Sequence, residues 1–483
     1  MSTHQHRTNL QHQGAGILLF LPVILALVVS AWVNLQLFQD GAAYLYQLVQ
    51  TRSTAIMHQR FSANVVQAPI VLSLHLLALS PIEDAMPLMR FLFCLGYGLI
   101  PLLGLRLSWQ VVQATTKPLL IWPWLIIVWI NLVNFSWVSE ILIALQLACP
   151  LLLGISCVPI HQTNGHTSSR WIWPLTIGLS GVIFGFHPLV VLIFGIATVG
   201  CVYLSIQWHG SARLSDFPTW SCEYASRFYE RMALFFGSLT IAKGLWAIAS
   251  INPYEKSFLT AHQRNHYLFA SSTEDQLFLI GSLLIGGLCL LAQHVHQTPK
   301  AIRWIYGCCM GVAIASACIL ISQYRYHPLQ LKTGLSIGVS LFLLLLMFID
   351  VAKLQRNQLH QQQPQGLNLQ FRQRLMVALS FIFLIVVLTQ SLLWHKAVHQ
   401  LRTVMVASPT ECMERYSSDF DWIYQPPHQI LNNWSLPVLA LLQGDRAMRT
   451  TLIADNCQGY ETSHTADIYP WTNIPKDQLR PQL

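Results

Sequence analysis

The sequence has few charged residues for its length. Lys, Arg, Asp and Glu make up 10% of the 483 residues, whereas soluble domains carry about 25%. The mean hydropathy is +0.46, and apolar runs of about 18 residues or more, each long enough for a transmembrane helix, recur along the whole chain. This composition excludes an ordinary soluble protein and predicts an all-α polytopic membrane protein.

We expect about eleven transmembrane helices in this chain. A further apolar segment, 64–80, is short and contains Gln67, Pro69 and His75, so it could cross the membrane or lie along its surface. The expected spans are 16–38, 88–106, 118–136, 139–158, 171–185, 187–206, 232–250, 276–294, 303–322, 333–351 and 374–394.

Several sequence motifs are also missing. The chain has no phosphate-cradling glycine loop, no His/Cys metal spacing and no nucleophile elbow, which argues against an ATP-driven pump and against a serine hydrolase. The net charge of +8 is spread over short loops rather than gathered in a basic patch, so we expect no nucleic-acid partner.

The distribution of Lys and Arg predicts the orientation of the chain. If residues 64–80 do not cross the membrane and the N-terminus is cytoplasmic, the inner loops hold about twice as many Lys and Arg as the outer loops, in line with the positive-inside rule. We therefore expect a transmembrane domain over 1–395, a first outer loop over 39–87, and an extracytoplasmic C-terminal segment over 396–483. Cys412 and Cys457 are the only cysteines of that segment, and an oxidising compartment favours a disulfide between them.

This orientation places an unusual set of polar groups on the outer side. Asp40 directly follows the first span, and Glu140 begins the fourth. A carboxylate can act as general base toward an acceptor hydroxyl, while Arg and Lys can hold a phosphate as it leaves. The further candidates for substrate contact on this side are Tyr44, Arg60, His187, Lys256, Arg264 and Arg325.

The layout resembles that of the C-type (GT-C) membrane glycosyltransferases, the superfamily of protein mannosyltransferases, aminoarabinose transferases and oligosaccharyltransferases. In that superfamily a catalytic acid follows the first membrane helix, and two helices of the first outer loop lie near the membrane surface. Asp40 occupies the place of the acid, and segments 42–60 and 62–81 match the two surface helices. The resemblance implies transfer of a sugar from a polyprenyl-phosphate or polyprenyl-diphosphate donor to an extracytoplasmic acceptor, among membrane lipids. Separately, the absence of organelle signals in the sequence favours a bacterial inner membrane as the location.

One position departs from the pattern of that superfamily. Many members have two adjacent acids, whereas the second position here is Gly41. This departure argues against a metal site built on the pair, although a divalent metal remains open as a cofactor. It favours a mechanism in which Asp40 acts alone or together with Glu140.

Structural roles are alternatives for each of these candidates. Asp40 could cap the helix that begins near Gly41, and Glu140 could do the same for its span. Arg60 could contact lipid headgroups, and His187 could form a turn with Pro188.

A lysine and several tryptophans inside the expected spans also need an explanation. Lys243 lies inside a span, where function, snorkelling or pairing would each account for it. Trp122, Trp124, Trp171 and Trp173 are expected to anchor the chain at the membrane interface. At the level of the whole chain, a transporter or flippase for a lipid-linked or small polar solute is the main rival to the enzyme, and a non-catalytic protein of envelope assembly is a third alternative.

Overall fold

The computed structural model describes most of the N-terminal half and the last two long helices. The described residues are 3–38, 40–54, 61–76, 82–112, 116–134, 138–163, 169–211, 219–250, 333–359, 366–407, 412–414, 418–424, 431, 436–443, 452–454, 465–467 and 473–475. Arg60, Lys256, Arg264, Arg325 and Cys457 lie outside them, and Cys412 is described in its backbone alone. The expected disulfide therefore stays a prediction.

The described part of the chain is almost entirely helical. Its long helices are α1 (Thr3–Trp32), α4 (Ile82–Val111), α5 (Ile121–Asn134), α6 (Glu140–Thr163), α7 (Ser169–Phe184), α8 (Val190–Ser211), α9 (Thr219–Ala249), α14 (Thr333–Leu359) and α15 (Gly366–Ala407). Short helices are η1 (Leu35–Leu37), α2 (Asp40–Thr51), α3 (Ala63–Leu76), η2 (Lys117–Leu120), η3 (Ser418–Tyr424) and α16 (Leu436–Gln443).

Strands occur only in the C-terminal segment of the described chain. β1 (Cys412–Glu414) pairs in parallel with β2 (Leu452–Ala454), and β3 (Thr465–Asp467) pairs antiparallel with β4 (Asn473–Pro475). Each strand has three residues, so these pairs are local features of the tail. The expectation of a helical membrane domain holds for the described helices.

Five of the described helices are long and apolar enough to cross a membrane. They contain the windows Met86–Val111, Glu140–Pro159, Val190–His209, Cys222–Ala249 and Arg372–Ala407. Shorter apolar helices cover Leu18–Trp32, Ala63–Leu76, Lys117–Asn131, Trp173–Phe184 and Ile337–Ala352. The chain therefore has the helices of a multi-pass membrane protein, while the number of about eleven crossings stays a prediction.

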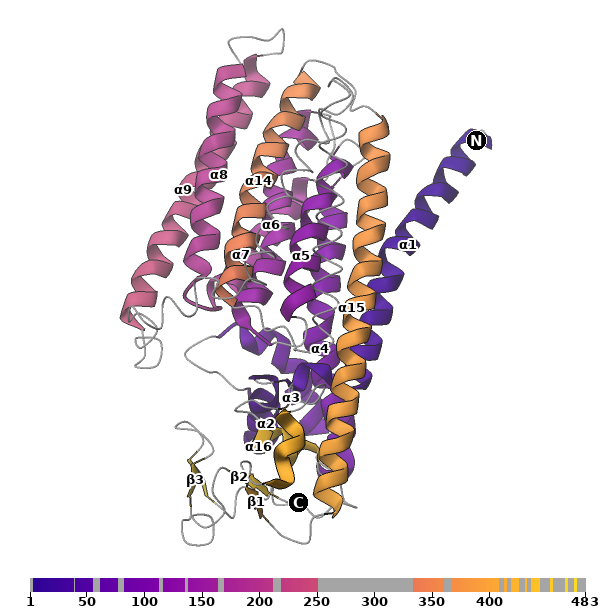
Figure 1. The fold of residues 1–483 in the computed structure, drawn as a ribbon. Helices are drawn as coiled ribbons and strands as arrows, with labels where there is room; N and C mark the ends of the chain where they lie inside the picture. Colours follow the sequence, from indigo (N-terminus) through magenta and orange to yellow (C-terminus); the bar gives the residue numbers. More distant parts are fainter. Residues whose placement is uncertain are drawn as a thin grey trace.

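Helices α1 and α4 pack side by side in opposite directions. Phe20, in the middle of α1, meets Trp109 near the end of α4 with ring centroids 5.9 Å apart, and Leu27 lies against Gly98, further back along α4. The end of α1 and the start of α4 therefore lie at the same end of the bundle. Figure 1 shows α2 and α3 at this end, away from the N-terminus.

The C-terminal segment returns to the same end. α15 continues to Ala407, beyond the domain boundary expected at 395, and α16 packs against α2 and α15. Arg90 of α4 donates to the Leu442 carbonyl oxygen at 2.6 Å, and Arg402 of α15 donates to the Gln443 side chain at 2.7 Å. Charge-assisted hydrogen bonds of this kind fix the tail beside the first loop.

The opposite end of the bundle is held by a buried ion pair. Arg372 of α15 lies 2.8 Å from Asp350 of α14, and both side chains are almost completely buried. The Asp350 carboxylate also accepts from Trp122 Nε1 at 2.8 Å, while Trp124 Nε1 donates to Ser380 at 2.9 Å. Trp122 and Trp124 are both 0% exposed. The expectation that they anchor the chain at the membrane interface was wrong, because buried hydrogen-bond acceptors on α14 and α15 hold their indole N–H groups inside the bundle.

Candidate active site at the end of the first helix

The turn that leads out of α1 places Asp40 at the start of α2. Asn34 adopts a left-handed backbone with φ of 59°, a conformation that Asn tolerates better than most residues. The short helix η1 follows, and the Gly41 N–H donates to the Phe38 carbonyl oxygen at 3.2 Å. Asp40 is half-buried in the first turn of α2.

Gly41 lies directly against the backbone of η1. A Cβ atom added to Gly41 would lie 1.7 Å from the Gln36 carbonyl oxygen and 3.2 Å from the Val138 side chain. Any side chain at position 41 would therefore displace the backbone. This contact explains physically why a second acid does not follow Asp40, and it leaves Asp40 as the single carboxylate at this turn.

A second carboxylate reaches α2 from another helix. Glu140, in the first turn of α6, is 5% exposed, and its Oε1 accepts a hydrogen bond from the Tyr44 hydroxyl. Residues four apart share a face of a helix, so Asp40 and Tyr44 lie on the same face of α2. The structure therefore brings Tyr44 and Glu140 together and places Asp40 one helical turn away.

Both carboxylates also suit a structural role. Asp40 and Glu140 each lie in the first turn of a helix, where a negative charge is stabilised by the helix dipole. Such stabilisation leaves a carboxylate able to accept a proton, so the helix-end role and a catalytic role are compatible.

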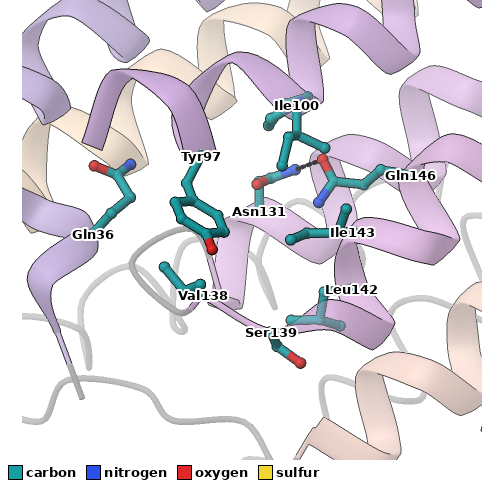
Figure 2. Close-up of a pocket in the computed structure, with 10 residues that line it drawn as sticks. Gln36, Tyr97, Ile100, Asn131, Val138, Ser139, Leu142, Ile143 and Gln146 are labelled. Carbon is teal, nitrogen blue, oxygen red and sulfur yellow. Dashed lines mark hydrogen bonds between the residues drawn. The ribbon is translucent and has the colours of Figure 1, made fainter. Parts of the chain in front are cut away.

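A small polar cavity lies next to these groups, between η1, α4, α5 and α6. Its volume is about 20 Å³, enough for one or two water-sized groups. Asn131 Nδ2 donates to Gln146 Oε1 at 3.3 Å and to the Ile127 carbonyl oxygen at 2.6 Å. Figure 2 shows Asn131 and Gln146 on one side of the cavity, Tyr97 facing them, and Gln36 beyond Tyr97.

His187 and Lys243 have structural partners. His187 Nδ1 accepts from the Leu189 N–H at 3.1 Å, as expected of a turn between α7 and α8. Lys243 Nζ donates to the carbonyl oxygens of Phe184 and Phe186, at 2.7 and 2.9 Å, and lies 4.3 Å from the centroid of the Trp246 ring. A cation at the C-terminal end of a helix is stabilised by the helix dipole, so Lys243 pairs with the end of α7.

The site thus differs in part from the expected one. Tyr44 and Glu140 are joined, and His187 forms a turn, while the Arg and Lys candidates for phosphate contact lie outside the described residues. Within the described ranges, no group of three or more His, Cys, Asp or Glu side chains is placed to hold a metal ion.

Sequence reasoning missed the amide side chains of the cavity. Gln36, Asn131 and Gln146 are all buried, and each is flanked on both sides by an apolar residue. A buried polar group costs free energy unless it finds a partner. An amide residue between apolar neighbours was therefore a signal in the sequence of a buried polar side chain that needs a hydrogen-bond partner.

No model of a known protein family matches the chain, and comparisons with curated proteins and with solved structures give no match either.

Proposed function

We propose that this protein is an integral membrane glycosyltransferase. It moves a sugar from a polyprenyl-phosphate or polyprenyl-diphosphate donor to an acceptor hydroxyl on the extracytoplasmic face of a bacterial inner membrane. In this orientation the N-terminus is cytoplasmic and the C-terminal segment is periplasmic. The observation that carries the proposal is the hydrogen bond from Tyr44 to the buried Glu140 carboxylate, because it fixes α2, and Asp40 with it, at the end of the membrane helices.

Asp40 is the general base in this mechanism. Its carboxylate takes the proton of the acceptor hydroxyl as the oxygen attacks the anomeric carbon of the donor sugar. The bond between that carbon and the phosphate oxygen breaks, and the polyprenyl phosphate or diphosphate leaves with the electron pair. Half-burial at the start of α2 suits this role, since a base at the membrane surface can meet both a lipid-borne donor and a water-borne acceptor.

Glu140 and Tyr44 are positioning residues in this mechanism. Their hydrogen bond ties α2 to α6, and a positioned base accelerates proton transfer only when its geometry is held. Four cationic residues, Arg60, Lys256, Arg264 and Arg325, remain candidates for holding the leaving phosphate. The fixed tail helix α16, beside α2, closes the same end of the bundle and would limit access of water to the reacting groups.

A transporter and an enzyme predict different positions for the polar side chains along the membrane helices. A transporter concentrates polar groups near the midplane of the membrane. In this chain the Asp40 and Glu140 carboxylates lie at the starts of α2 and α6, and the Asp350–Arg372 pair lies at the opposite end of the bundle. The amide cavity itself reaches from Ser139, before α6, to Ile100 and Pro101 in the middle of α4. The charges at the ends of the bundle, rather than the depth of the cavity, favour the enzyme.

Purified protein in sealed vesicles distinguishes the two functions. The vesicles would contain polyprenyl-phosphate donors labelled in the sugar, and the products would be separated by chain length and polarity. The enzyme releases free polyprenyl phosphate and labels a new acceptor. A flippase leaves the label on the original lipid and only changes the leaflet that holds it, and that result would contradict the proposal. Repeating the assay with a chelator tests for a divalent metal.

A further inference from the structure

The amide-lined cavity beside Asp40 has the chemistry of a binding subsite. The polar side chains that line it are Gln36, Tyr97, Asn131, Ser139 and Gln146, and all are uncharged. Amide and hydroxyl groups both donate and accept hydrogen bonds. A neutral hydroxyl also does both, so it matches this wall, whereas a phosphate or an ammonium group would find no counter-charge among these lining side chains.

One polar atom of the wall is left without a partner. Gln36 is 2% exposed, and its Nε2 donates to Ser30 at 3.4 Å, but its Oε1 is buried with no hydrogen-bond partner among the described residues. Most buried polar atoms in proteins have at least one such partner. A buried acceptor that is left unpaired costs free energy. Figure 2 shows this oxygen on the side away from Tyr97 and the amide nitrogen on the Tyr97 side, so Gln36 offers the cavity its amide nitrogen, a hydrogen-bond donor.

The cavity adjoins the candidate base through Gly41. Gln36 and Val138 both line the cavity, and both lie against Gly41, the residue after Asp40. Ser139, another lining residue, directly precedes Glu140. A substrate arm held in the cavity would therefore reach the turn that carries Asp40.

The size of the cavity limits what can enter it. A volume of about 20 Å³ accepts one or two water-sized groups, which is far less than a sugar ring. The apolar lining residues, Ile100, Pro101, Val138, Leu142 and Ile143, would contact the carbon that bears the hydroxyl. A single hydroxyl or hydroxymethyl arm of a sugar fits these dimensions.

We infer that this cavity binds one hydroxyl-bearing arm of a sugar and so orients that sugar against Asp40. The inference rests on the proposed glycosyl transfer and adds a specificity site to it. The hydroxyl could belong to the donor sugar or to a sugar acceptor, and the two sources are distinguishable by the ligand that is offered.

The test measures binding to the full-length protein in nanodiscs. The probes are bare polyprenyl phosphate and a panel of polyprenyl-phosphate sugars comprising a hexose, an N-acetylhexosamine and a pentose, with the matching methyl glycosides as mimics of an acceptor. We expect wild-type protein to bind one sugar-bearing lipid, or one methyl glycoside, about tenfold more tightly than the analogue that lacks the hydroxyl arm, the effect of one or two hydrogen bonds. A preference among lipids assigns the cavity to the donor, and a preference among glycosides assigns it to the acceptor.

Two variants test the cavity itself. Gln36→Met removes the amide nitrogen that faces Tyr97, together with the unpartnered oxygen, and keeps the size of the side chain, so the protein should keep its Tm. Gln146→Leu leaves Asn131 Nδ2 its bond to the Ile127 carbonyl oxygen. Both variants should lose the tenfold preference, whereas Gln47→Met, the same exchange on α2 outside the cavity, should keep it.

The outcomes separate the subsite from the reaction. If Gln36→Met and Gln146→Leu fold and keep the full preference, or if wild-type protein shows no preference across the panel, the subsite is wrong. If transfer depends on Asp40 in the same preparations, the proposed enzyme survives that result. If the preference depends on both glutamines and no donor is consumed, the subsite stands and the glycosyl transfer is wrong.

Discussion

The Tyr44 hydroxyl donates a hydrogen bond to the Glu140 carboxylate, and this bond joins the first loop to a membrane helix almost a hundred positions later in the chain. Both side chains are buried. Because the loss of a hydrogen bond to a buried charged group costs about 1–3 kcal/mol, we expect Tyr44→Phe to lower the free energy of unfolding by that amount. Denaturant unfolding in detergent, followed by tryptophan fluorescence, would measure the loss, and glycosyl transfer should fall with it.

Tyr46 supplies the matched control for this exchange. Its side chain is also buried, but its hydroxyl has no hydrogen-bond partner in the part of the chain that the structure describes. Tyr46→Phe should therefore leave stability unchanged or raise it. Equal losses in the two variants would show that the bond to Glu140 contributes nothing specific.

Tyr46 also gives a pH dependence with a definite sign. Burial raises the pKa of Tyr46 to about 12, above the unfolded value near 10. Ionisation of Tyr46 therefore leaves the free energy of unfolding unchanged below pH ~10. As the pH rises from ~10 through ~12, the unfolded chain loses the tyrosine proton first, so the free energy of unfolding falls. Tyr46→Phe should flatten this part of the profile relative to wild type.

Gly41 should not tolerate any side chain. A Cβ at this position would overlap the Gln36 carbonyl oxygen, and overpacking typically costs about 1–3 kcal/mol or more. We expect Gly41→Ala to lower the Tm and to reduce transfer by shifting Asp40. Gly178→Ala in α7 is the control, because a Cβ there meets nothing within 4 Å, and Ala is favoured over Gly in a helix by about 0.5–1 kcal/mol. A Gly41→Ala protein as stable and active as wild type would contradict the close approach of η1 and α2.

The ion pair at the other end should behave as a unit. Arg372→Met leaves the Asp350 carboxylate buried without its guanidinium partner, and breaking such a pair costs about 3–5 kcal/mol. Adding Asp350→Asn removes the uncompensated charge, so the double variant should be less destabilised than the sum of the two single variants. The free energies of unfolding of the wild type, the two single variants and the double variant form a double-mutant cycle. Strict additivity of the two single effects would mean that the pair is not coupled.

The orientation of the chain can be tested with reporter fusions. α4 ends at Val111, at the opposite end of the bundle from α15, which ends at Ala407. Fusions after Val112 and Gln365 should therefore read as cytoplasmic, and a fusion after Thr410 as periplasmic. Cytoplasmic activity at Thr410 would place the Asp40 site on the wrong side for an extracytoplasmic acceptor.

Much of the fold was predictable because membrane helices are strongly apolar. The pair of short helices after Asp40 was expected at 42–60 and 62–81, and the structure has α2 at Asp40–Thr51 and α3 at Ala63–Leu76. The loop charges predicted that the first loop and the tail share one side, and the packing of α16 on α2 agrees. Hydropathy and loop charge act locally along the chain, so a single sequence displays them directly.

The partners of individual side chains were less predictable, because they depend on which helices meet. Trp122 was expected at the membrane interface, but the Asp350 carboxylate of α14 holds it in the interior. The hydrogen bond between Tyr44 and Glu140 joins segments that lie far apart in the sequence. The close approach of the Gly41 and Gln36 backbones is local, but residue types alone do not reveal the distance between two backbones. The position of Asp40 at the start of α2 was predictable, because an acid directly after an apolar span is visible in the sequence, while its catalytic role stays a prediction.

The most direct test of the account is the transfer activity of Asp40→Asn. Asn is similar in size to Asp and suits the start of a helix nearly as well, so expression and Tm should match wild type. The loss of a positioned general base typically costs a factor of about 10²–10⁴ in rate. Glu83→Gln, in the first turn of α4 at the same end of the bundle, controls for the loss of one negative charge and should retain full activity. The account predicts a folded Asp40→Asn protein that still binds the lipid-linked donor but transfers sugar at least a hundredfold more slowly, whereas unchanged transfer by the folded variant would contradict it.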